Sequence, residues 1–229
     1  MSAEGQRFSH SSKGRLTGRD TGRFPGPSLF DRIGRAICQA GCLPRKELYE
    51  AWETARRVRR LFRGGRVVDV AGGHGLLAHM MLLLDDSSPG AVVVDPLAPP
   101  SAQSLTDALA AAWPRLAGRV EFIPAGIDDI ELLPTDVLVS SHACGSLTDR
   151  ILDRAVEARA RVAVLPCCHD FDTCDFGAID GWLNRPLAID VMRAITLETH
   201  GYRVWTQTIP DEVTPKNRLL LGSPELAAV

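Results

Sequence analysis

The chain has 229 residues, of which 45% are hydrophobic and 24% charged, and its formal net charge is −2 at pH 7. This length fits one globular domain with appendages, and the near-neutral charge excludes a global field that would attract nucleic acid. The longest apolar run, residues 80–84, is too short to span a membrane, and the first residues lack the apolar core of a signal peptide. With six cysteines and no secretion signal, we expect a cytoplasmic protein that binds no membrane.

The first 64 residues divide into two parts. Residues 1–27 are rich in Gly, Ser and Arg, which predicts a disordered basic tail, either solvated or lying on a phosphate backbone. Residues 28–64 have apolar residues at helical spacing and predict a helical extension of two helices. The second helix carries an arginine-rich face between Arg56 and Arg63, which is either an ordinary solvated face or a platform for an anionic substrate. Residues 65–229 then form the main domain.

A glycine-rich turn opens the main domain. Residues 67–75 read Val-Val-Asp-Val-Ala-Gly-Gly-His-Gly, an apolar strand and a turn, and the apolar residues 76–84 follow as a helix. Glycine adopts positive φ cheaply, and without a Cβ it lets a ligand lie against the backbone at a helix N-terminus. A second apolar strand ends at Asp95, which is placed to accept hydrogen bonds from both hydroxyls of a ribose. The turn alone is weak evidence for a ligand site, because many glycine-rich turns only reverse the direction of the chain.

Strands and helices alternate through the rest of the chain. Further strands are predicted over residues 120–123, 136–140, 162–165, 202–209 and 219–221, with helices over 101–113, 146–156 and 187–200. This alternation predicts an α/β fold in which ligands collect at the carboxyl edge of a mostly parallel sheet.

Several titratable side chains follow these strands directly. His142 comes after the fourth strand and is our first candidate for a general base, which Asp149 or His169 could orient or replace. Asp128, after the third strand, either accepts from an adenine amino group or caps a helix.

Four of the six cysteines fall close to the same edge. Cys144 follows the fourth strand, Cys167 and Cys168 end the fifth, and Cys174 comes shortly after. Adjacent cysteines usually point in different directions, so we expect a substrate pocket without a metal. Cys38 and Cys42 lie four residues apart with no second ligand pair nearby, which favours packing over a zinc site.

Together these motifs resemble a known enzyme family. The spacing Asp69-x-Ala71-x-Gly73-x-Gly75 is similar to the D/E-x-G-x-G-x-G motif of class I S-adenosylmethionine (SAM) methyltransferases, with Ala71 in place of the first glycine. His-x-Cys-Gly-x-x-Thr-Asp from His142, Cys-Cys-His from Cys167 and Thr-Pro-x-Asn before the last strand resemble one group of them. This group includes eukaryotic tRNA acceptor-stem 2′-O-methyltransferases and related methyltransferase-domain proteins. The match covers about residues 46–222, and the compact chain looks more like a bacterial relative.

The resemblance implies a fold, a cofactor and a set of site residues. The fold is Rossmann-like α/β, with a seven-stranded, mostly parallel sheet and helices on both faces, and the cofactor is SAM. Residues expected to bind the cofactor are Asp69, Ala71, Gly73, Gly75, Asp95, Ile127, Asp128 and Ser140. Residues expected at the substrate are Cys144, Gly145, Cys167, Cys168, Lys216, Asn217 and Arg218, beside the candidate bases His142, Asp149 and His169.

The implied activity is methyl transfer to RNA, with a tRNA 2′-hydroxyl as the acceptor in the tRNA enzymes of the group. Two features depart from the tRNA enzymes: their N-terminal zinc-binding modules are absent, and the composition is not basic. Methyl transfer to a small molecule or a protein is therefore the alternative, and a non-catalytic binding module is a second one. The sequence gives no indication of oligomeric state.

Overall fold

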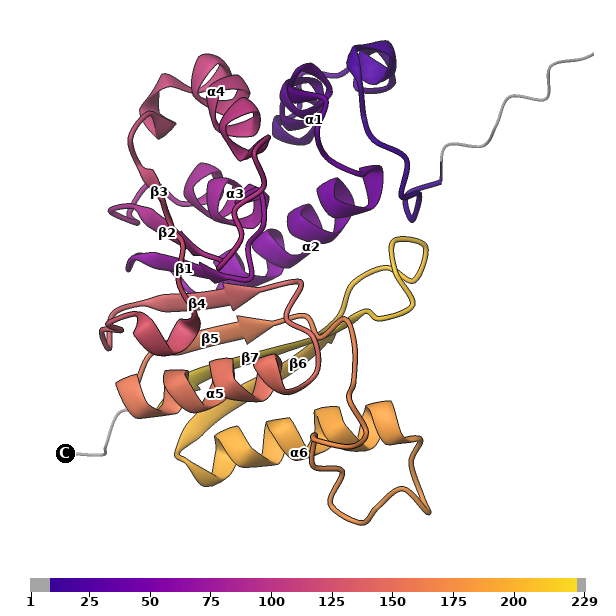
Figure 1. Ribbon diagram of the computed structural model, residues 1–229, viewed down its shortest axis with the longest axis vertical. Helices are drawn as coiled ribbons and strands as arrows, with labels where there is room; N and C mark the ends of the chain where they lie inside the picture. The colour runs from indigo at the N-terminus through magenta and orange to yellow at the C-terminus, as the bar shows by residue number, and fades with distance from the viewer. Residues whose placement is uncertain (1–8, 226–229) are drawn as a thin grey trace, which may run out of the picture.

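A single mixed sheet with helices on both faces organises the computed structural model, which describes residues 9–225 (Figure 1). The strands are β1 (Val67–Val70), β2 (Ala91–Val94), β3 (Val120–Ile123), β4 (Val137–Ser140), β5 (Arg161–Val164), β6 (Tyr202–Thr208) and β7 (Arg218–Pro224). Their order is β3-β2-β1-β4-β5-β7-β6, and only β7 runs antiparallel to its neighbours. The predicted seven-stranded, mostly parallel Rossmann-like sheet is confirmed.

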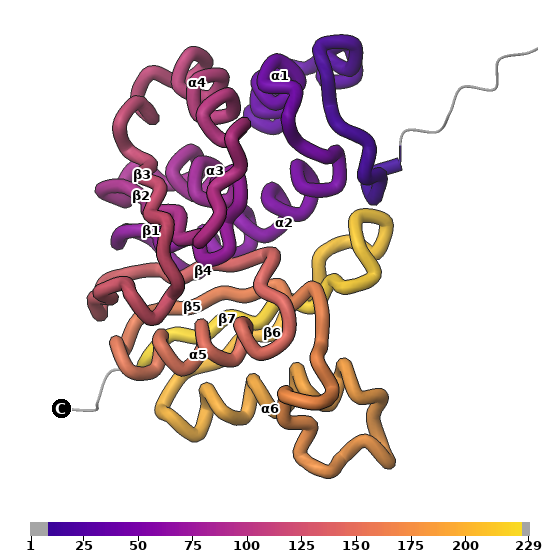
Figure 2. The backbone as a smooth tube through the Cα atoms, in the orientation of Figure 1, coloured from indigo at the N-terminus to yellow at the C-terminus, as the bar shows by residue number. Residues whose placement is uncertain are grey.

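The two faces of the sheet carry different helices (Figure 2). The helices are α1 (Leu29–Ala40), α2 (Arg45–Leu61), α3 (Leu76–Leu84), α4 (Ala102–Ala112), α5 (Ser146–Ala158) and α6 (Arg185–Thr199). Successive residues of a strand point to opposite faces. Val67 therefore packs with α1 to α4 in one core, whereas Val68 packs with α5 and α6 in the other. None of the helices within residues 9–225 is long and apolar enough to cross a membrane.

The order of the strands places a ligand crevice at the centre of the sheet. β1 pairs with β2 on one side and with β4 on the other, so the chain changes direction across the sheet between them. Ligands of open α/β sheets bind outside the carboxyl ends of the strands at this switch point. The loops after β1, β2 and β4 are therefore the place to look for a site.

The segment before α1 is ordered where the structure describes it, so the prediction of a disordered tail is wrong for residues 9–27. Leu16 and Phe24 are buried, and a short 3₁₀ helix, Gly18–Arg23, lies between them. The carbonyls of Ser12 and Gly14 accept hydrogen bonds from the backbone N–H groups of Lys46 and Arg45. These donors belong to the first turn of α2, and the N–H groups of a first turn have no acceptors within their own helix. The segment therefore supplies hydrogen-bond acceptors for the N-terminus of α2. Residues 1–8 of the predicted tail lie outside the described residues.

Three arginines of the arginine-rich face of α2 are already paired within the protein. Arg59 is only 2% exposed, donates to the Met81 carbonyl at 3.0 Å and pairs with Asp85 at 3.1 Å. Arg56 and Arg57 both pair with Glu53 one turn earlier on the same helix. The substrate-platform hypothesis is wrong for these three side chains, because their partners come from α2 itself and from the end of α3.

Candidate active site

The turn after β1 is built from left-handed backbone. Ala71, Gly73 and Gly75 have φ values of 54°, 51° and 74°. A Cβ on Gly75 would lie 2.8 Å from the Val93 side chain and 3.0 Å from Phe122, so this glycine is required by internal packing. A Cβ on Gly73 would meet nothing within 4 Å. The backbone at Gly73 is therefore open to a ligand, which fits its predicted role.

Ala71 carries a side chain in a conformation that favours glycine, and Ala71→Gly should stabilise the fold. The left-handed conformation costs a non-glycine residue about 1–2 kcal/mol, and the greater freedom of glycine in the unfolded chain offsets about 0.4–1 kcal/mol. We expect a melting temperature higher by roughly 1–4 °C in thermal unfolding. The control is Ala78→Gly inside α3, where the same substitution should destabilise by about 1 kcal/mol. A lower melting temperature in Ala71→Gly would contradict the prediction.

Two carboxylates hold the glycine-rich turn. Asp69 at the end of β1 is 1% exposed and accepts from the backbone N–H of Ala78 at 3.0 Å. Burial raises the pKa of Asp69 to about 7. Asp95, after β2, accepts from the N–H of Gly73 at 3.0 Å and from that of Leu97 at 3.0 Å. Asp69 therefore fixes the turn to α3, and Asp95 fixes it to the end of β2.

His142 lies in a hollow beside this turn. The hollow is lined by Asp69, Gly72, His74 and His142, together with Glu47 from the first turn of α2. His142 is exposed, yet desolvation by the surrounding protein lowers the pKa of its ring below the ordinary value. A histidine of this kind is neutral at pH 7 and can accept a proton.

Glu47 and His74 were not predicted from the sequence. Burial, and then the negative charge of Glu50, raises the pKa of Glu47 to about 7. His74 interrupts the glycine motif itself, its Nε2 lies 2.9 Å from the Ser101 hydroxyl, and burial lowers its pKa. The position of His74 inside the motif was a usable signal. Nothing in the spacing of α2 indicates that Glu47 faces the crevice.

The side chains expected near the adenine are buried or already have partners within the protein. Ile127 is buried, and Ser140 is buried with its Oγ accepting from the N–H of Ala143 at 3.1 Å. Asp128 pairs with Arg150 at 2.5 Å, and this hydrogen bond lowers the pKa of Asp128. Asp129, not Asp128, accepts from the Gly126 N–H at the start of the short helix there, so the capping alternative for Asp128 is wrong.

Asp149 and His169 are held in an ionic network away from His142. Arg193, with a side chain only 3% exposed, donates to Asp149 at 2.6 Å and pairs with Asp190 at 3.3 Å. His169 and Arg218 lie 2.8 and 2.6 Å from Asp190. Neither Asp149 nor His169 lines the hollow of His142. These contacts join α6 to the first turn of α5, through Asp149, and to the loop after β5, through His169.

The remaining predicted substrate residues differ in what they contact. Asn217 donates to the Ile209 carbonyl at 3.0 Å and so closes the loop between β6 and β7. Lys216 Nζ lies 3.3 Å from the sulfur of Cys168. Gly145 has a φ of 56°, and its N–H donates to the Cys168 carbonyl at 3.1 Å, which joins the loops after β4 and β5.

These loops bring three thiols together. The sulfur atoms of Cys144, Cys167 and Cys168 all lie within 4.8 Å of one another. Our expectation that adjacent cysteines point apart is therefore wrong for this pair. Cys174 contacts Arg193 instead. Cys38 and Cys42 are buried in the core, which confirms the prediction that they pack.

Comparison with known proteins identifies the family. A family model described as "Methyltransferase domain" matches residues 47–171, more than half of the chain. The chain belongs to this methyltransferase-domain family. Within the methyltransferase, the matched residues contain the glycine-rich turn, Asp95 and the loops that carry His142 and the three thiols.

Individual relatives are more distant. The methyltransferase is 25% identical over 197 residues to a glutathione S-transferase C-terminal domain-containing protein of Xenopus laevis, covering 70% of this chain but only 31% of that protein. An O-methyltransferase family protein from Burkholderia thailandensis is similar in structure, with a TM-score of 0.54 at 16% identity, over 95% of this chain and 66% of that one. The SAM-dependent methyltransferase SibL is also similar in structure, with a TM-score of 0.52 at 20% identity, over 92% of this chain and 66% of that one. At these identities the structural likeness supports the fold alone.

The match to a methyltransferase-domain family implies S-adenosylmethionine as the methyl donor, and the observed turn fits this cofactor. The open side of Gly73 lets a ligand approach the backbone, and the Asp95 carboxylate lies directly beside it. The hollow with His142 and Glu47 continues from the same turn. The predicted cofactor therefore agrees with the family match and with the geometry of the turn, while the roles of single residues stay predictions.

Proposed function

We propose that this methyltransferase transfers the methyl group of SAM to a hydroxyl of RNA, with a tRNA 2′-hydroxyl as the leading acceptor. The proposal has two parts, the base that removes the hydroxyl proton and the class of molecule that carries the hydroxyl. SAM supplies an electrophilic methyl group. The residues of this chain must hold the acceptor oxygen in line with that group and take its proton.

His142 is our candidate for the base. It follows β4, lines the hollow beside the cofactor turn, and has a lowered pKa, so its ring is neutral and accepting at pH 7. Glu47 lines the same hollow. Because the pKa of Glu47 is raised to about 7, its carboxyl can also exchange a proton in this range, and it is a second candidate to accept or relay one.

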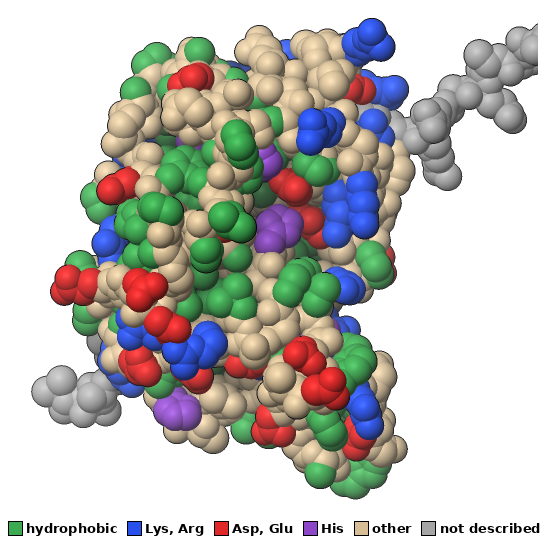
Figure 3. All heavy atoms as spheres, in the orientation of Figure 1, with side chains coloured by type: hydrophobic (Ala, Val, Ile, Leu, Met, Phe, Trp, Pro, Cys, Tyr) green, Lys and Arg blue, Asp and Glu red, His purple; other side chains and the backbone are tan. Residues whose placement is uncertain are grey.

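Exposed cations on the ordered segment before α1, which we call the basic rim, carry the RNA proposal. Lys13, Arg15 and Arg19 are exposed on the ordered segment that packs against α2. The positive charge of Arg15 contributes to the lowered pKa of His74, after burial, and the charge of Lys46 acts on His142 in the same way. Figure 3 shows Lys and Arg side chains near the His side chains on this face, with acidic side chains between them. Such a rim suits a phosphate backbone.

An apolar groove favours a second candidate, a small-molecule hydroxyl. The groove lies between α6 and the strands β6 and β7, and it includes Leu187, Val191, Ile195 and Leu220. It also includes Pro166, which directly precedes Cys167 at the end of β5. A flat apolar acceptor would fit there with its hydroxyl toward the thiol loops.

Incubation with labelled SAM tests the proposal directly. Total tRNA, ribosomal RNA and a small-molecule extract serve as separate acceptors. We expect label in tRNA, at a nucleotide that resists alkaline cleavage because its 2′-hydroxyl is blocked. Label that enters only the small-molecule extract would replace RNA by the second candidate.

The basic rim predicts a specific dependence of RNA binding on salt. The triple variant Lys13→Ser, Arg15→Ser, Arg19→Ser should weaken tRNA binding. The logarithm of the binding constant falls linearly with the logarithm of the salt concentration. For each single-strand phosphate that the variant no longer neutralises, this slope should become shallower by about 0.7. The control is Arg56→Ser, Arg57→Ser, because these two arginines are already paired with Glu53 and should not contribute. Equal slopes in the rim variant and the wild type, measured by filter binding, would contradict the RNA proposal.

A further inference from the structure

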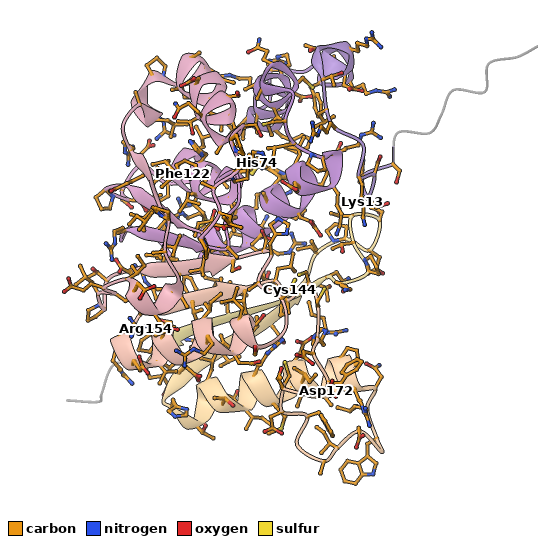
Figure 4. The ribbon with its side chains drawn as sticks, viewed as in Figure 1. Lys13, His74, Phe122, Cys144, Arg154 and Asp172 are labelled. Carbon is orange, nitrogen blue, oxygen red and sulfur yellow. The ribbon has the colours of Figure 1, made fainter. Side chains whose placement is uncertain are left out.

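The three thiols behind His142 form a cluster that methyl transfer as described above does not use. Cys144 and Cys168 are exposed, Cys167 is half-buried, and the Cys144 and Cys167 sulfurs are 2.7 Å apart. No other His, Cys, Asp or Glu within residues 9–225 joins this group as a ligand. Figure 4 shows Cys144 beside the carboxyl ends of β4 and β5, in the loop that leads into α5.

The backbone around the cluster is fixed by bonds that do not involve the sulfurs. Cys144 and Cys168 form an isolated parallel bridge, closed by the Gly145 N–H donating to the Cys168 carbonyl. The Thr148 hydroxyl donates to the Ala143 carbonyl at 3.1 Å, and the buried Arg193 donates to the Gly145 carbonyl at 3.1 Å. The two loops therefore present their thiols together before any ligand arrives.

We propose that Cys144, Cys167 and Cys168 bind one zinc ion as a three-thiolate site with an open fourth position. Thiolates are preferred ligands of zinc, with zinc–sulfur bonds of about 2.3 Å. Tetrahedral geometry then separates the sulfurs by about 3.8 Å. The observed separations, from 2.7 Å to no more than 4.8 Å, bracket this value, so small side-chain rotations suffice. Each thiol that coordinates releases its proton to solvent.

The fourth position distinguishes this site from a closed structural one. Structural zinc sites use four protein ligands, whereas sites that bind a substrate or water keep one position open. Here the two exposed thiols leave the ion accessible from solvent at the carboxyl edge of β4 and β5. Lys216, 3.3 Å from the Cys168 sulfur, would donate to a ligating sulfur and so reduce the negative charge of the site.

Cadmium and zinc titrations of the full chain, kept reduced with a non-thiol reductant, test the proposal. Cadmium should give thiolate-to-metal absorption that saturates at one equivalent. Zinc should compete for the site, and elemental analysis should find one zinc per chain after gel filtration. The variants Cys144→Ser, Cys167→Ser and Cys168→Ser should each lower zinc affinity about 100-fold or more, exceeding the effect of removing an outer partner.

The control variant is Cys174→Ala, which removes a nearby cysteine that contacts Arg193 and lies outside the cluster. It should bind zinc like the wild type. SAM affinity, measured on every variant, reports whether the fold is intact. Absence of cadmium absorption in the wild type, or absorption unchanged in the three serine variants, would overturn the proposal. Loss of zinc binding in Cys174→Ala alone would show that the ion binds at Cys174 and not at the proposed cluster.

Discussion

His142→Ala lowers the methyl-transfer rate about 10²-fold or more and leaves SAM affinity nearly unchanged, if His142 is the base. The expected loss is the low end of general-base effects. The measurement is turnover with labelled SAM, combined with calorimetry for the cofactor. The matched control is His200→Ala at the exposed end of α6, where the imidazole lies 2.7 Å from the Thr196 carbonyl. Wild-type turnover in His142→Ala would return His142 to a structural role, and an equal loss of cofactor binding would make it a cofactor contact.

The pH profile gives a second measurement of the same role. Desolvation lowers the pKa of His142 below 6.5, so the neutral, accepting ring persists to a more acid pH than that of a free histidine. Turnover of the wild type should hold from pH 7 down to 6.5 and fall below it, as the ring gains its proton. His142→Ala should lose this acid limb. A limb that remains in the variant would belong to another group, with Glu47 the first to examine because its pKa is raised to about 7.

Asp95→Ala raises the dissociation constant for SAM and for S-adenosylhomocysteine about 10- to 100-fold. A hydrogen bond to a charged acceptor contributes about 1.5–3 kcal/mol before water compensates. Asp95→Ala removes the expected acceptor of two such bonds, one from each ribose hydroxyl. The variant also removes the acceptor of the Gly73 N–H, so the turn itself becomes less defined. Asp95→Asn should lose less cofactor affinity, because the amide oxygen of asparagine still accepts a hydrogen bond.

The control for Asp95 is Asp107→Ala, which removes an exposed carboxylate of α4 that contacts only Gln103. Calorimetry should show unchanged cofactor affinity there. Unchanged affinity in Asp95→Ala would remove Asp95 from the site, whatever its contact with the turn.

The fold could be predicted because its signals are local. Each parallel strand is a short apolar run followed by a turn residue, and the motif from Asp69 to Gly75 specifies one turn. Even so, Ala71 adopts a φ of 54°, a conformation that no propensity would assign to alanine. The buried strands around the turn determine it.

The parts that sequence reasoning missed depend on partners far along the chain. Arg59 looks like a surface charge on a helix, but its acceptors, Met81 and Ser88, are 22 and 29 residues away. Arg193 captures Asp149 from 44 residues away. Glu47 shares the hollow with Asp69, 22 residues further on, and with His142, 95 residues further on. Spacing within one element carries no information on such contacts.

The position of β7 has a consequence for how this protein is made. β7 is synthesised after both β5 and β6, yet it lies between them. While the ribosome adds the residues between Val164 and Arg218, a delay on the order of seconds, the edge of β5 has no partner. An unpaired apolar strand edge invites pairing with another chain. Yield in cells should therefore depend on translation speed and chaperones, and any chain that stops before Arg218 leaves β5 and β6 without their common neighbour.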